Sequence, residues 1–83
     1  MKAHQLIASA AFDPAQLKSM KQAFDDAWEQ IAPQISTRPK AIDAARFRLA
    51  QLVLSVAKRG ILEREKLKAE ALRLMQEALA TRP

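Results

Sequence analysis

The sequence predicts an all-α fold, an antiparallel three-helix bundle with short connections. Three segments repeat apolar residues at helical spacing, no segment alternates as a strand does, and proline or glycine separates each segment from the next. Alanine, the strongest helix former, supplies 17 of the 83 residues, against a single glycine. Short connections favour antiparallel neighbours and up-down-up order in one domain over residues 12–80. An open arrangement that completes its core by dimerisation is the alternative.

The first helix is expected over residues 14–32. Asp13 is a typical N-cap residue, Pro14 suits the first helical position, and Gln16 can close a capping box. Pro33 lacks the amide that a helix interior uses and ends the helix. Residues at helical spacing form one apolar face: Leu17, Met20, Phe24, Ala27, Trp28, Ile31 and Ile35.

The second helix is expected over residues 38–59 and is apolar over more than half of its circumference. One flank contains Ile42, Ala45, Leu49, Leu52, Val53 and Val56, and the other contains Phe47, Ala50, Leu54 and Ala57. So broad an apolar surface predicts contact with two neighbours and a central position in the bundle. The helix ends at Gly60, which is expected in the left-handed conformation.

The third helix is expected over residues 63–80. Its apolar face contains Leu67, Ala71, Leu74, Met75 and Ala78, and Leu72 and Leu79 extend that face sideways. Four ion pairs at i,i+3 or i,i+4 are predicted on its outer surface: Glu63–Lys66, Glu65–Lys68, Glu70–Arg73 and Arg73–Glu77. Residues 1–11 contain no helix signals and are expected to form a flexible N-terminal segment.

The composition supplies little for enzyme chemistry. The chain has no cysteine, one histidine (His4) and one glycine, which excludes thiolate metal sites and the usual phosphate-binding loops. Asp25, Asp26 and Glu29 form an acidic cluster, but a bundle metal site needs carboxylates and histidines from several helices, so a solvated or salt-bridged surface is expected. We therefore predict no catalytic residue, no metal, no cofactor, no small-molecule substrate and no enzyme activity.

The net charge of +5 lies mainly in residues 36–60, where six basic residues stand against one acidic residue. Five of the basic residues are candidates for contact with an anion or with nucleic acid: Lys40, Arg46, Arg48, Lys58 and Arg59. No stretch is apolar enough to span a membrane or to serve as a signal peptide, and a cytoplasmic location is expected.

Arg46 is unusual because it falls inside the apolar arc of the second helix. Buried arginines are rare unless they are paired. The structural interpretation lays its stem along apolar surface, with the guanidinium reaching Asp43 or a carboxylate of the first helix, such as Asp25 or Glu29. The functional interpretation is an anion-binding site at the edge of the bundle, and the structural one is favoured.

Three leucines, Leu54, Leu72 and Leu79, are predicted to form an apolar patch at the seam of the second and third helices. A contiguous exposed patch usually marks an interface, so a homodimer or another protein partner is expected there. The predicted function is a non-enzymatic protein-interaction or regulatory module. Weak nucleic-acid binding through the basic outer face of the second helix is the alternative, although a recognition helix that opens with Glu63 and Glu65 argues against a helix-turn-helix mode.

Part of the chain, residues 12–75, also resembles a group of small, uncharacterised helical proteins of alphaproteobacteria. The resemblance rests on Phe12-Asp13-Pro14, Ala23-Phe24, Trp28, Arg46, Leu49-Ala50, Ala57, Gly60, Leu67 and Ala71-Leu72. Such proteins tend to have an aspartate before the last helix, where this chain has Ile61-Leu62-Glu63. The resemblance implies a compact helical fold and no particular activity.

Overall fold

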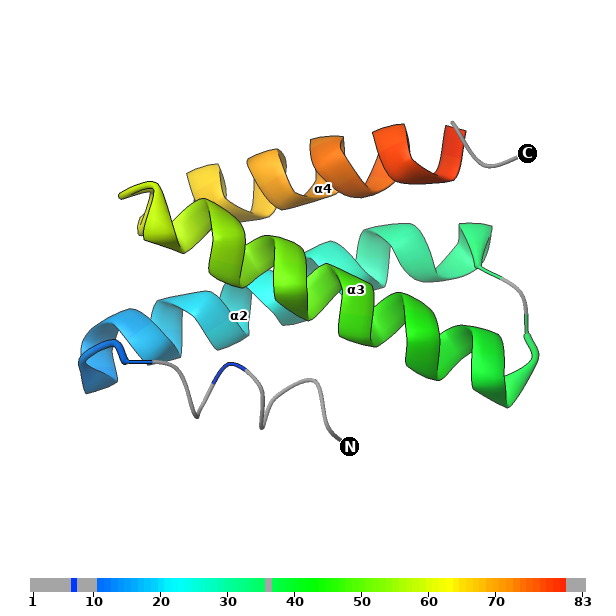
Figure 1. Cartoon of the computed structure of the whole chain (residues 1–83), viewed down its shortest axis with the longest axis horizontal. Coiled ribbons are helices and arrows are strands. Elements are labelled where there is room, and N and C mark those ends of the chain that lie inside the picture. The colour runs from blue at the N-terminus through cyan, green and yellow to red at the C-terminus, as the bar shows by residue number, and fades with distance from the viewer. Residues whose placement is uncertain (1–6, 8–10, 36, 81–83) are drawn as a thin grey trace.

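The computed structural model describes residues 7, 11–35 and 37–80, which form three α-helices and one short 3₁₀ helix. These are α2 (Pro14–Ile31), η1 (Ala32–Gln34), α3 (Pro39–Lys58) and α4 (Arg64–Ala80). Successive α-helices run in opposite directions, as Figure 1 shows. The predicted all-α three-helix bundle is confirmed, and each helix begins and ends within one residue of the position that the sequence predicts.

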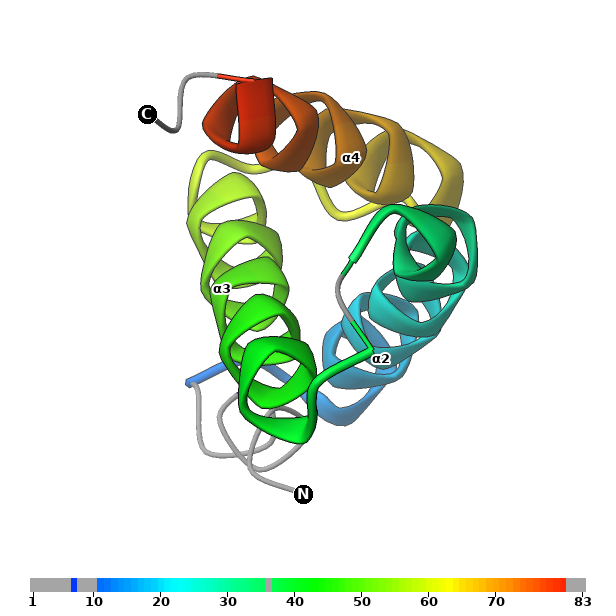
Figure 2. The same ribbon diagram turned by 90° about the vertical axis from the view of Figure 1, so that its right-hand side faces the viewer.

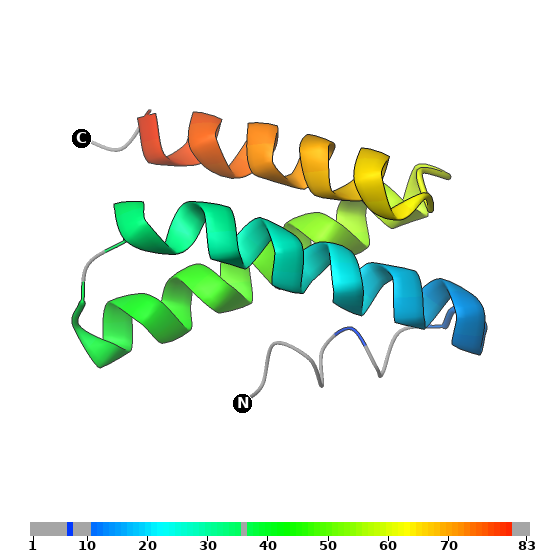
Figure 3. The same cartoon turned by 180° about the vertical axis from the view of Figure 1, so that it is seen from behind.

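The three helices lie at the corners of a triangle in the end-on view of Figure 2. Each helix packs against both of the others, and α2 and α4 run side by side in Figure 3. The broad apolar surface of α3 therefore contacts two neighbours, as predicted. Because α2 and α4 also contact each other, α3 occupies one of three corners and is not a central element.

The start of α2 follows from its capping residues. The Gln16 backbone N–H donates to Oδ1 of Asp13 at 2.9 Å, and the Asp13 backbone N–H donates to Oε1 of Gln16 at 3.2 Å. This reciprocal capping box satisfies two backbone donors that would otherwise lack partners, and Pro14 follows in the first turn. At its C-terminal end, α2 leads directly into the 3₁₀ helix η1, which contains Pro33.

The turn between α3 and α4 depends on Gly60. Its φ is +95°, a conformation that side chains disfavour, and its backbone N–H donates to the Ala57 carbonyl at 2.9 Å. The left-handed glycine predicted after the second helix is confirmed. The bond closes the end of α3, so that α4 begins only a few residues later, at Arg64.

One apolar core fills the space between the helices. Its buried residues are Ile7, Met20, Ala23, Phe24, Ala27, Ile31, Leu49, Ala50, Val53, Val56, Ala57, Leu67, Ala71, Leu72 and Met75. Trp28 is half-buried and packs against this core, whereas Phe47, predicted on an apolar flank, is 41% exposed. The flank that contains Phe47 thus faces the outside of the bundle in part.

Ile7 is a core residue, although it lies in the N-terminal segment that the sequence predicts to be flexible. The predicted flexible segment, residues 1–11, lies outside the described residues except for Ile7 and Ala11. The Ile7 side chain is completely buried among residues of the helices. At this position, therefore, the core extends beyond the three helices.

Candidate functional site

An ion pair joins α2 to the start of α4. The Arg64 Nε donates to Oδ2 of Asp26 at 2.6 Å, and Nη2 donates to Oδ1 at 3.0 Å. This bidentate geometry is the strongest that arginine and a carboxylate adopt. The hydrogen bonds from Arg64 lower the pKa of Asp26 below its ordinary value of 3.8. One carboxylate of the predicted acidic cluster is thus salt-bridged across the bundle.

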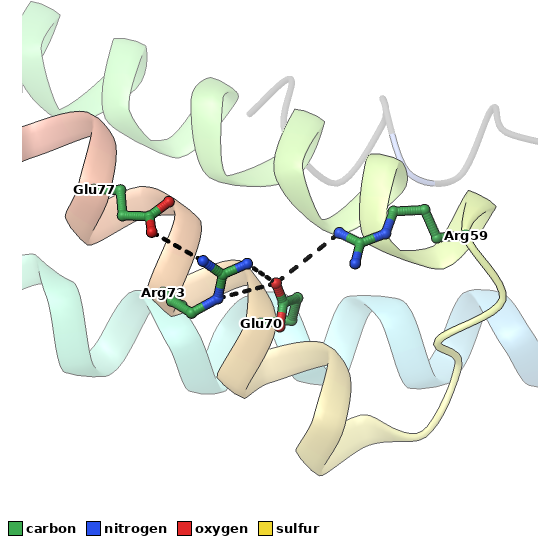
Figure 4. A network of polar contacts seen from close by, with 4 residues as sticks. All are labelled: Arg59, Glu70, Arg73 and Glu77. Carbon is green, nitrogen blue, oxygen red and sulfur yellow. Dashed lines mark hydrogen bonds and ion pairs between the residues drawn. The ribbon is translucent and has the colours of Figure 1, made fainter.

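A second polar network connects α3 to the middle of α4 (Figure 4). Arg73 donates to Glu70 and, at 2.9 Å from its Nη1, to Oε1 of Glu77. Glu70 also faces Arg59, whose Nη1 lies 3.9 Å from Glu70 Oε1. The hydrogen bond from Arg73 lowers the pKa of Glu70, with help from the nearby charge of Arg59. All four ion pairs predicted along the third helix are present in the structure.

Arg46 lies over two aromatic rings of α2. Its guanidinium carbon is 5.3 Å from the ring centre of Phe24 and 4.9 Å from that of Trp28. Both distances are within the range of a cation–π contact. Arg46 therefore covers the aromatic pair on the α2 side of α3. Lys40 lies on the outer face of α3, and Arg46 lies roughly 120° around the helix axis from Lys40.

The other four candidate basic residues differ in their contacts. Lys40, Arg48 and Lys58 are exposed and point to the outside of α3. Arg59 faces Glu70 and belongs to the polar network. The predicted residues therefore differ in their surroundings, and their contact with an anion or nucleic acid stays a prediction.

The leucine patch predicted at the seam of α3 and α4 does not form. Leu72 is only 8% exposed and belongs to the core, while Leu54 and Leu79 are partly buried against it. Leu54 also lies roughly 140° around α3 from Arg59, the residue that faces α4. Because none of the three leucines is exposed, the predicted apolar surface patch is absent, and this prediction of an interface is corrected.

A pocket of about 460 Å³ opens at the end of the bundle where η1 leads into α3 and where α4 ends. It is lined by Gln34, Ile35, Ala41, Ala44, Ala45, Arg48, Met75, Ala78 and Leu79. Four of these residues are alanines, whose short side chains leave the space between α3 and α4 unfilled. Of the predicted site residues, only Arg48 and Leu79 line it.

The pocket is not among the features predicted from the sequence, although the sequence contains a signal for it. Ala41, Ala44 and Ala45 share one side of α3, and a row of alanines on a surface helix reads first as helix propensity. Whether such a row of alanines packs closely against a neighbouring helix depends on where the two helices cross. Ala78 stands on the other wall, so small residues meet small residues and the space remains open.

Comparisons of the chain with protein-family models, with curated proteins and with solved structures found no match. The resemblance to small alphaproteobacterial proteins therefore stays a prediction. None of the helices described by the structure is long and apolar enough to cross a membrane. Within the described residues, no group of three or more histidines, cysteines or carboxylates is placed to hold a metal ion.

Proposed function

We propose that the domain is a non-enzymatic protein-interaction module that binds its partner at the pocket between η1, α3 and α4. The observation that carries this proposal is an apolar hollow with one charged residue, Arg48, among its lining residues. Its volume of about 460 Å³ lies in the range of roughly 300–1,000 Å³ that is usual for small-molecule pockets, so it has room for a large apolar side chain of a partner. A small domain also buries little surface alone and gains proportionally from docking.

The proposal is tested by filling the pocket. Ala44 is exposed at the lining of the pocket, so Ala44→Trp fills it without disturbing the core. Ser55→Trp adds the same side chain to an exposed site on α3 outside the pocket and is the matched control. A polypeptide from the native host that wild type and Ser55→Trp retain, and that Ala44→Trp loses, is the expected result. Equal retention by all three proteins would place the partner elsewhere.

Nucleic-acid binding is the second candidate function, favoured by three exposed basic residues on α3. Lys40 and Lys58 lie on the same face, 18 residues and thus about 27 Å apart, with Arg48 between them. Three phosphate contacts predict that the logarithm of the affinity falls with the logarithm of salt concentration with a slope of about −3. A slope near zero, or an unchanged affinity in Lys58→Glu, removes this candidate.

The helix-turn-helix mode has little support for α4. Its first residue, Arg64, is bound to Asp26 of α2, and Lys66 pairs with Glu63 at 3.7 Å. A recognition helix needs these N-terminal positions for bases and phosphates. Any nucleic acid would therefore be bound along α3.

A further inference from the structure

Arg48 is the charged residue among those that line the pocket. It is exposed, and within the described part of the chain it forms no ion pair. Lys40, Ala44 and Arg48 follow one another at i, i+4 and i+8, so the two basic residues flank the small alanine along one side of α3. Of these three residues, Ala44 and Arg48 line the pocket, and Lys40 lies one helical turn before Ala44.

The α4 wall has a different character. The lining residues there are Met75, Ala78 and Leu79, all apolar. The nearest acidic neighbour in the sequence, Glu77, has its carboxylate engaged by Arg73 at 2.9 Å. The positive charge of Arg48 therefore has no counter-ion on the lining of the pocket. The pocket therefore presents apolar side chains on its α4 wall and the positive charge of Arg48 on its α3 wall.

We infer that the pocket docks an acidic amphipathic segment of a partner protein, which inserts a large apolar side chain and sets a carboxylate against Arg48. This inference rests on the proposed function and adds the chemistry of the partner. Burial of the apolar side chain supplies the affinity, and the pairing with Arg48 selects the charge sign. A basic segment would meet the like charge of Arg48 and would be rejected.

The test uses three synthetic peptides of twelve residues, labelled with fluorescein and measured by anisotropy against the full chain. The first contains only glutamate and leucine, with leucine at i, i+3, i+4 and i+7 so that one helical face is apolar. The second replaces each glutamate with lysine, and the third replaces each leucine with serine. Only the first is expected to bind with a Kd below about 1 mM.

Two variants locate the binding, each with a matched control. Arg48→Glu is expected to weaken the acidic peptide about tenfold. Lys58→Glu makes the same charge change about 15 Å further along α3 and should alter the Kd by less than about twofold. Ala44→Trp should abolish the binding that Ser55→Trp retains. Amide shifts of Ala41, Ala44 and Ala78 in nuclear magnetic resonance spectra place the peptide in the pocket.

Several outcomes would overturn the inference. Equal binding of the lysine peptide, or equal losses in Arg48→Glu and Lys58→Glu, would show that no acidic segment is selected at the pocket. No measurable binding of the acidic peptide would do the same. If a native polypeptide is still lost in Ala44→Trp, the proposed function stands without the acidic chemistry.

Two other occupants are also distinguished. Octanoate that shifts the pocket amides when no peptide binds would identify a small apolar carboxylate as the ligand. Pocket amides that shift on dilution of the protein alone would identify a second copy of the chain. Either result would overturn the acidic protein segment as the occupant.

Discussion

The N-terminal and C-terminal halves of α4 contact the rest of the bundle in different ways. In the N-terminal half, Arg64 binds Asp26 of α2, and Glu70 faces Arg59 of α3. In the C-terminal half, Ala78 and Leu79 line a pocket. The N-terminal half is joined to α2 and α3 by ion pairs, and the C-terminal end leaves open space beside α3.

This difference shows how a small domain can combine a fixed fold with a binding surface. Bidentate and multi-residue ion pairs fix the position of one helix against another, even where each pair adds little stability. With α4 positioned by its first half, the last turn of the helix, beyond the buried Met75, does not need to pack closely. Alanines at Ala41, Ala44 and Ala45 can then face α4 without collapse of the bundle.

The largest expected effect comes from equal truncations in the two halves. Leu67 is completely buried in the N-terminal half, so Leu67→Ala is expected to cost about 2–5 kcal/mol of unfolding free energy. Leu79 is partly buried and already borders open space, so Leu79→Ala should cost about 1 kcal/mol. Urea titration followed by circular dichroism measures both. Equal losses would mean that the halves are packed alike.

A smaller effect is expected at Gly60, which sets where α4 starts. Nothing lies within 4 Å of a Cβ built there, so Gly60→Ala acts only through its φ of +95°. The expected cost is about 1–2 kcal/mol. Gly60→Asn should cost less, since asparagine tolerates positive φ better than alanine. A melting temperature unchanged in Gly60→Ala would contradict this account of the turn.

The features that could be predicted from the sequence are those that depend on neighbours in the chain. The Asp13–Gln16 capping box, the left-handed Gly60 and the Arg73–Glu77 pair each join residues at most four positions apart or depend on a single residue. Their geometry follows from helix periodicity and capping alone. The helix boundaries, and with them the fold class, follow from the same local rules.

The features that could not be predicted depend on how the helices are rotated and crossed. Asp26 and Arg64 are 38 positions apart, and nothing in the sequence pairs them. Leu72 is expected at the edge of the apolar face of α4, but it is only 8% exposed and belongs to the core. The burial of Ile7 likewise depends on a tertiary contact that has no helical periodicity.

The smallest expected effect concerns the ion pair between Asp26 and Arg64, and it depends on pH. Hydrogen bonds from Arg64 hold the pKa of Asp26 in the folded state below the value of 3.8 expected in the unfolded chain. A carboxylate whose pKa is depressed on folding stabilises the fold above its unfolded pKa. That stabilisation is lost as the pH falls through the lower folded pKa. Asp26→Asn should therefore melt below wild type at pH 7, with the difference fading below about pH 4.

Glu29→Gln is the matched control for this measurement. Glu29 lies three residues further along α2, is exposed, and forms no ion pair within the described part of the chain. Its loss removes one negative charge without removing a partner of α4, so its melting temperature should stay near wild type at every pH. Added salt should also shrink the effect of Asp26→Asn, because both partners are partly exposed to solvent. If the two variants melt alike at pH 7, or if the Asp26→Asn difference persists in strong acid, the ion pair does not hold α4 against α2, and the contrast between its halves rests on apolar packing alone.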